Sequence, residues 1–81
     1  MKPKLIYFYN PECPKCQELK PIVSEFSKNI NIETVNTYEE DLITENYDIQ
    51  WVPTLVIEDK NGKHKFQGAK EIKEVLKKVI L

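Results

Sequence analysis

The chain has 81 residues, of which 41% are hydrophobic and 31% charged, and its formal net charge is −1. This length is near the lower limit for a chain that buries its own core, so we expect one domain spanning residues 1–81. All twelve basic residues are lysines interspersed with thirteen acids, so no basic face predicts a nucleic-acid partner. No apolar run approaches the roughly 20 residues of a membrane span or forms a secretory leader, so we expect a cytoplasmic monomer that contacts no membrane.

The first part of the chain predicts a strand followed by a helix. Residues 5–9 form a short apolar and aromatic run, which is typical of a buried central strand. After Pro14, apolar residues at helical spacing predict one buried helix face, made of Leu19, Ile22, Val23, Phe26 and Ile30. Pro14 falls in the first turn, where proline is tolerated, whereas Pro21 lies inside the pattern and predicts a bend or local break.

A second strand and a second helix are expected in the middle of the chain. The strand is predicted at residues 32–36, where isoleucine and valine recur. Thr37-x-x-Glu40 has the form of a capping box and predicts a helix that starts there and ends near residues 47–48.

The last part predicts a hairpin and a final helix. Residues 54–58 are rich in strand formers, residues 59–62 have the composition of a tight turn, and residues 63–67 form a partly polar edge strand. Residues 69–81 predict a helix whose apolar face is made of Ile72, Val75, Leu76, Val79 and Ile80. The order β-α-β-α-β-β-α predicts an α/β fold with a four-stranded mixed sheet and helices on both faces. In this arrangement, parallel strands joined by helices come first and a hairpin closes the sheet.

The two cysteines of the chain, Cys13 and Cys16, lie between the first predicted strand and the first helix. A Cys-x-x-Cys pair at such a junction indicates a redox dithiol, because the loop it closes is too small to stabilise a fold. Free backbone N–H groups and the helix dipole favour a thiolate at Cys13, with Lys15 adding to this effect and Glu12 opposing it. Cys16 lies one turn further along and should be more covered. We therefore expect Cys13 to attack a disulfide and Cys16 to resolve the mixed disulfide, with no cofactor besides this pair.

Two alternative roles for the cysteine pair stay open. Free cysteines are often small buried hydrophobic residues without a chemical role. The pair could also supply half of a zinc site, which would need His64, a carboxylate or a second chain to complete it. We expect His64 to face solvent on the edge strand, and we expect no metal site.

Several further residues carry a resemblance to a known family. Pro21 follows Cys16 by five residues, Val52-Pro53 precedes the third predicted strand, and Gly62 and Gly68 occupy the hairpin turn and the start of the last helix. Together with the cysteines they make residues 5–80 similar to the thioredoxin superfamily, which implies a thioredoxin-like fold.

The resemblance implies a substrate groove beside the cysteines. The Val52–Pro53 bond is expected to be cis, which leaves the backbone of Val52 free to pair with an extended substrate segment next to Cys13. Trp51 is expected to lie at the rim of this groove; the less favoured alternative is that it belongs to the core, because tryptophan is large and often buried. Pro14, Lys15, Pro21, Gly68 and Tyr7 are expected to surround the active site.

Some positions depart from the patterns of the superfamily. Tyr7 stands where thioredoxins bury an aspartate, and a phenol with a pKa near 10 cannot serve as a base at neutral pH. Cys13-Pro14-Lys15-Cys16 is similar to the Cys-Pro-x-Cys of glutaredoxins. However, Asn10, Trp51 and the single Gly68 depart from their glutathione site, and no arginine is present to bind carboxylates.

The function implied by the resemblance is that of a thiol–disulfide oxidoreductase that reduces protein disulfides. Its electrons would come from a flavoprotein reductase or from glutathione. The alternatives are a glutathione-dependent enzyme of the glutaredoxin type and a non-catalytic module that binds a metal or docks a partner at Trp51.

Overall fold

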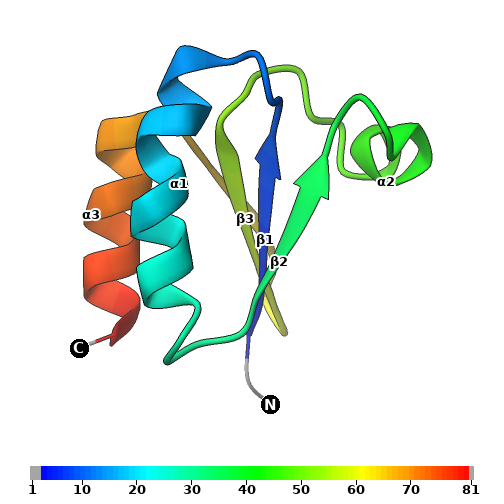
Figure 1. Cartoon of the computed structure of the whole chain (residues 1–81). Coiled ribbons are helices and arrows are strands. Elements are labelled where there is room, and N and C mark those ends of the chain that lie inside the picture. The colour runs from blue at the N-terminus through cyan, green and yellow to red at the C-terminus, as the bar shows by residue number, and fades with distance from the viewer. Residues whose placement is uncertain (1–2, 81) are drawn as a thin grey trace.

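The computed structural model describes the backbone of residues 3–80, and the side chains of residues 3–79. The elements are β1 (Lys4–Tyr9), α1 (Pro14–Phe26), β2 (Ile32–Asn36), α2 (Asp41–Asn46), β3 (Thr54–Asp59), β4 (Gly62–Gln67) and α3 (Ala69–Ile80) (Figure 1). The four strands form one mixed sheet in the order β2-β1-β3-β4. The predicted fold class and element order are therefore confirmed.

Strand β1 lies inside the sheet between a parallel and an antiparallel neighbour. Its residue Tyr7 lies opposite Thr34 of the parallel strand β2 and opposite Leu55 of the antiparallel strand β3. The prediction of parallel strands joined by helices thus holds only for β1 and β2. Helix α2 lies at the end of the sheet where β2 ends, so the chain enters β3 from that same end and runs back against β1 (Figure 1).

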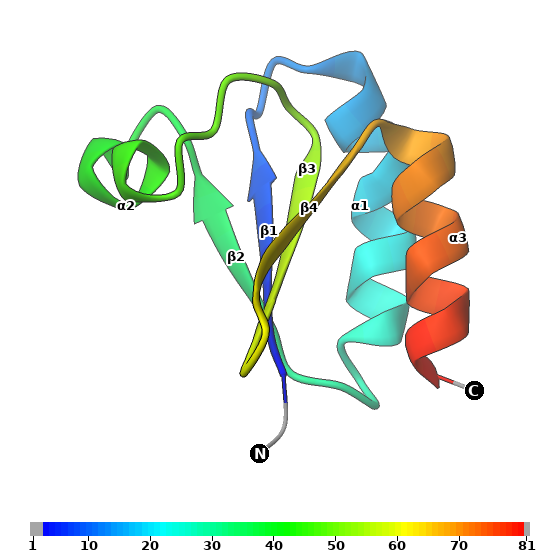
Figure 2. The same ribbon diagram turned by 180° about the vertical axis from the view of Figure 1, so that it is seen from behind.

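Helices cover both faces of the sheet, with α1 and α3 on one face and α2 on the other (Figure 2). Leu5 and Tyr7 of β1 pack in the cluster that includes residues of α1 and α3, whereas Ile6 and Phe8 belong to the opposite cluster. This is the alternation expected of a strand. Because both faces are covered, all four side chains are buried, which explains the continuous apolar run in the sequence.

The hairpin of β3 and β4 forms as predicted. Asp59 pairs with Gly62 across a two-residue loop, and the Asp59 side chain accepts the backbone N–H of Asn61 at 2.8 Å. Gly62 has a φ of +125°, a conformation that favours glycine. Strand β4 is an exposed edge apart from the half-buried Phe66, in agreement with its polar sequence.

The predicted start of the second helix is wrong. Helix α2 begins at Asp41, and its N-cap residue, Glu40, makes no side-chain capping bond. Thr37 does not cap the helix, because its backbone N–H donates to the Tyr9 carbonyl at 2.9 Å and so extends the contact between β1 and β2. The Asn36 side chain instead accepts the N–H of Tyr38 at 2.9 Å, which makes a turn before the helix.

The first and last helices differ from the prediction in smaller ways. Helix α1 continues through Pro21 without a break, although proline has no N–H to donate to the carbonyl one turn earlier. The helix ends at Phe26, so Ile30 lies beyond it and packs on the core from the following turn. On α3, Val79 is exposed, while Leu81 and the side chain of Ile80 lie outside the described residues. None of the helices within residues 3–80 is long and apolar enough to span a membrane.

Candidate active site

Cys13 is the N-cap residue of α1, with φ −80° and ψ 118°. Its carbonyl accepts the Gln17 N–H at 3.0 Å, and its sulfur accepts the Cys16 N–H at 3.2 Å. The sulfur thus takes the position that a serine or aspartate oxygen occupies in an ordinary N-cap.

The loop before α1 is held by local hydrogen bonds. The Asn10 side chain accepts the Glu12 N–H at 2.8 Å, and the Asn10 carbonyl accepts the Cys13 N–H at 3.0 Å. Gln17 donates from its side chain to the Pro11 carbonyl at 2.8 Å. The sequence prediction did not include this bracing role of Asn10, although asparagine is typical of such turns.

Cys16 lies deeper than Cys13, as the sequence predicts. It is buried, with 3% of its surface exposed, whereas Cys13 is half-buried. Burial raises the pKa of the Cys16 thiol to about 11, and its hydrogen bond to Cys13 acts in the same direction. The Asn10 backbone and the Tyr7 hydroxyl act in the opposite direction and lower its pKa by smaller amounts. Cys16 is therefore a poor thiolate in the free protein.

Tyr7 lies beneath the dithiol on β1. It is buried, its ring stacks on Tyr9 with centroids 5.9 Å apart, and its hydroxyl donates to the Cys16 carbonyl at 3.5 Å. Burial raises the pKa of Tyr7 further above its ordinary value, with the nearby Cys16 and Cys13 adding to the effect. Tyr7 is therefore neutral at physiological pH and is a hydrogen-bond donor to Cys16.

A second loop, far away in the sequence, lies against Cys13. The Val52–Pro53 bond is cis, as predicted, and the Val52 carbonyl lies 3.9 Å from the Cys13 sulfur. The Pro53 carbonyl accepts the N–H of Gly68, whose φ is +89°, at 3.1 Å. This bond connects the loop to the start of α3.

Two more residues define the outer part of this loop. The side chain of Trp51 is 65% exposed, which excludes the alternative that Trp51 belongs to the core. The Trp51 carbonyl accepts the hydroxyl of Thr54 at 2.6 Å, and Thr54 is itself 1% exposed. Our sequence prediction missed this anchoring role, because strands commonly contain threonine and no pattern shows where its hydroxyl points.

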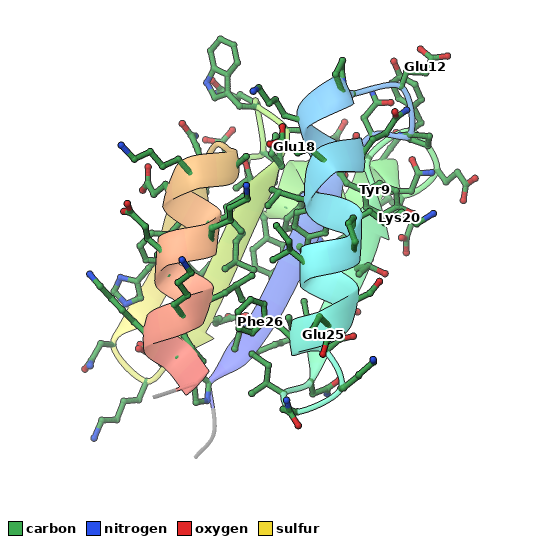
Figure 3. All side chains as sticks on the ribbon, turned by 60° about the vertical axis from the view of Figure 1, so that its left-hand side comes forward. Tyr9, Glu12, Glu18, Lys20, Glu25 and Phe26 are labelled. Atoms are coloured by element: carbon green, nitrogen blue, oxygen red, sulfur yellow. The ribbon has the colours of Figure 1, made fainter. Side chains whose placement is uncertain are left out.

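The structure does not bring every predicted residue against the cysteines. Pro14 occupies the first helical turn, and Lys15 is exposed, with its Nζ 3.6 Å from the Glu18 carboxylate. Glu18 also approaches Lys73 of α3 at 3.7 Å, and Figure 3 shows it on the side of α1 that faces α3. Pro21 lies exposed further along α1, and none of the hydrogen bonds found among the described residues joins it to either cysteine.

Side chains that could bind a metal do not cluster in the part of the chain that the structure describes. Within residues 3–80, no three side chains of histidine, cysteine, aspartate or glutamate lie close enough to hold a metal ion together. His64 is exposed, as predicted, and lies 3.5 Å from the Asp59 carboxylate near the hairpin. The dithiol is at the opposite end of the sheet, so His64 cannot join it in one site.

The fold and the placement of the dithiol agree with comparisons to known proteins. The model of the thioredoxin family matches residues 1–80, and the chain belongs to this family. It is 33% identical to "Thioredoxin Y, chloroplastic" of Oryza sativa subsp. japonica, over 96% of this chain and 49% of that protein. It is 35% identical to the thioredoxin of Methanocaldococcus jannaschii, over 84% of this chain and 81% of that protein.

Solved structures show the same fold. Thioredoxin 1 from Thermosipho africanus superimposes with a TM-score of 0.79 and 29% identity, over 94% of this chain and 89% of that one. The chain spans about half the length of the rice relative, and 20% of a putative protein disulfide-isomerase of Dictyostelium discoideum.

Proposed function

We propose that the protein is a thiol–disulfide oxidoreductase that reduces disulfides in other proteins. The observation that carries this proposal is the pairing of a half-buried N-cap thiol, Cys13, with a buried thiol, Cys16, one helical turn behind it. Membership of the thioredoxin family supports the same activity. The relatives named thioredoxin Y and protein disulfide-isomerase are both much longer than this chain.

The proposed reaction has two exchange steps. The Cys13 thiolate attacks one sulfur of a substrate disulfide, the substrate S–S bond breaks, and the released thiolate takes up a proton. Cys16 then loses its proton and attacks the Cys13 sulfur, which breaks the mixed disulfide and releases the second substrate thiol. The substrate gains two electrons and two protons, and the protein is left with a Cys13–Cys16 disulfide.

The substrate is proposed to bind along the loop that contains Val52. The Val52 carbonyl faces the Cys13 sulfur, so an extended peptide paired with the Val52 backbone would carry its disulfide to Cys13. The exposed Trp51 side chain would supply apolar contact next to this strand.

The pair itself is the proposed redox centre, without a further cofactor, and a flavoprotein reductase is the proposed electron donor. Glutathione is not favoured in this role, because the chain has no arginine for its carboxylates and belongs to the thioredoxin family. A cytoplasmic location and a monomeric state remain predictions from the sequence.

Reduction of insulin in the presence of dithiothreitol tests the proposal. We expect the wild-type protein to accelerate the reaction well above dithiothreitol alone, and both Cys13→Ser and Cys16→Ser to lose this acceleration. The two variants form a matched pair, because only Cys16→Ser retains the attacking thiol and should accumulate a mixed disulfide detectable by mass spectrometry. A wild-type rate equal to that of dithiothreitol, or full activity in both variants, would contradict the proposal.

A further inference from the structure

A pocket of about 560 Å³, with Cys16 in its wall, opens on the side of α1 that faces away from α3. Tyr7 and Tyr9 of β1, Thr34 of β2 and the residues Lys20 and Ser24 of α1 contribute to its wall. Figure 3 shows Tyr9 and Lys20 together on this side of α1, with Glu18 on the other side of the helix. Of the two cysteines, only Cys16 lines the pocket.

Because Cys16 lines the pocket and Cys13 does not, the pocket offers a route from the buried cysteine to solvent that does not pass Cys13. Its volume is many times the roughly 30 Å³ that one water molecule occupies in the liquid, so water can enter it. A protein substrate paired with Val52 would cover the Cys13 side of the dithiol. The pocket lies between α1, β1 and β2 and would stay open in that complex.

Few titratable groups face Cys16 or the pocket. They are Cys13 at the N-cap of α1, Tyr7 and Tyr9 on β1, and the cation Lys20 on α1. Among the described residues, no carboxylate lines the pocket, and β2 contributes only the uncharged Thr34. The ion pair between Glu18 and Lys73 lies across α1 from the pocket. A neutral tyrosine and a protonated lysine cannot accept a proton.

We propose that in the resolving step the Cys16 proton leaves through this pocket directly to solvent, and that the Tyr7 hydroxyl donates a hydrogen bond to the thiolate that remains. This inference rests on the proposed function, because it concerns the second exchange step. Water or a buffer base takes the proton, the Cys16 sulfur bonds to the Cys13 sulfur, and the substrate leaves with the electron pair of the broken S–S bond.

The position of Tyr7 suits the role of a positioning residue. Its hydroxyl donates to the Cys16 carbonyl at 3.5 Å, next to the group that ionises, and its single proton can turn from that carbonyl to the sulfur once a thiolate forms. In the mixed disulfide Cys13 has no free thiol, so the hydrogen bond and charge of Cys13 no longer oppose ionisation of Cys16. Burial remains, and Tyr7 is the side chain that offsets it.

Tyr7→Phe should change the rate of the resolving step in two opposing ways, through the fraction of Cys16 that is ionised and through the nucleophilicity of its thiolate. Loss of a hydrogen bond to a charged sulfur should lower the thiolate fraction of Cys16 near neutral pH by about 10- to 100-fold. A more basic thiolate is also more nucleophilic, by about threefold per pKa unit. The net expectation is a resolving step that is about three- to tenfold slower near neutral pH.

Stopped-flow reaction of the reduced protein with 5,5′-dithiobis(2-nitrobenzoic acid) separates the two steps, because each step releases one thionitrobenzoate. We expect the second-phase rate to rise about tenfold per pH unit between about pH 6 and about pH 8, without a plateau. Tyr7→Phe should slow the second phase as calculated and leave the first unchanged. Ser24 lines the pocket, so the indole of Ser24→Trp should block part of it and also slow the second phase. Ser27→Trp, at an exposed position outside the pocket, should not slow it.

A pH-independent second phase in this range would reveal an internal base and overturn the proton route. An unchanged second phase in Ser24→Trp would do the same, and an unchanged second phase in Tyr7→Phe would overturn the role of Tyr7. These outcomes leave the proposed function intact as long as the first phase is normal and insulin is reduced. Loss of insulin reduction in the wild type would instead overturn the proposed function, and the inference with it.

Discussion

The hydroxyl of Thr54 connects the loop of Trp51 and Val52 to the core, and Thr54→Val should reveal how much this hydrogen bond contributes to stability. Thr54 is almost fully buried, and its hydroxyl donates to the Trp51 carbonyl at 2.6 Å. Valine has a similar shape but leaves that carbonyl without its partner. A buried hydrogen bond contributes about 0.5–1.5 kcal/mol, and an unsatisfied partner costs about 1–3 kcal/mol, so we expect a loss of about 1–2 kcal/mol in unfolding free energy.

For a domain of this size, that loss corresponds to a decrease of roughly 5–15 °C in Tm, measurable by circular dichroism. The substitution should also weaken substrate binding, because the hydrogen bond holds Trp51, and the carbonyl of the next residue, Val52, faces Cys13. We expect the KM for insulin to rise several-fold in Thr54→Val, while the reaction with a small disulfide, which needs no groove, keeps its wild-type rate.

Thr44→Val is the matched control for this experiment. The Thr44 hydroxyl also donates to a backbone carbonyl, that of Glu40 at 2.8 Å, but it lies on α2 away from the dithiol. Its substitution should leave the KM for insulin unchanged. The reasoning would be refuted if Thr54→Val matched the wild type in both Tm and KM, or if Thr44→Val raised the KM equally.

Two further predictions concern stability. Leu19→Ala should lower the free energy of unfolding, measured in urea, by about 2–5 kcal/mol, because Leu19 is fully buried between α1 and the sheet. Leu42→Ala, at a position 78% exposed, should change it by less than about 0.5 kcal/mol. Equal effects of the two substitutions would contradict the assigned core. The stability of the reduced protein should fall as pH rises from about 9 to about 11, because the pKa of Cys16 is raised in the folded state and the folded protein holds this proton more tightly than the unfolded chain does. This contribution to stability is complete below about pH 9. Urea titrations at each pH should show that Cys16→Ala removes the fall in unfolding free energy between about pH 9 and about pH 11. An unchanged fall in this variant would contradict the assignment of the pH dependence to Cys16.

The strands and the site of the dithiol could be predicted because their signals are local. The apolar run of β1 reflects burial on both faces, and the turn at Gly62 depends on one residue's backbone conformation. The capping box failed for the opposite reason. Thr37 has the right spacing to Glu40, but its N–H pairs with Tyr9, which is a neighbour only after the sheet has formed.

The sequence by itself determined that Cys13 would start a helix and that Cys16 would follow one turn later, since the N-cap bond between them joins residues three positions apart. Tertiary structure decided what surrounds them. The Val52 carbonyl reaches Cys13 from 39 residues away, and the pocket beside Cys16 needs side chains from β1, β2 and α1 together. Local hydrogen bonds act within one turn of the chain, whereas the difference in burial between the two thiols depends on how the helices pack on the sheet.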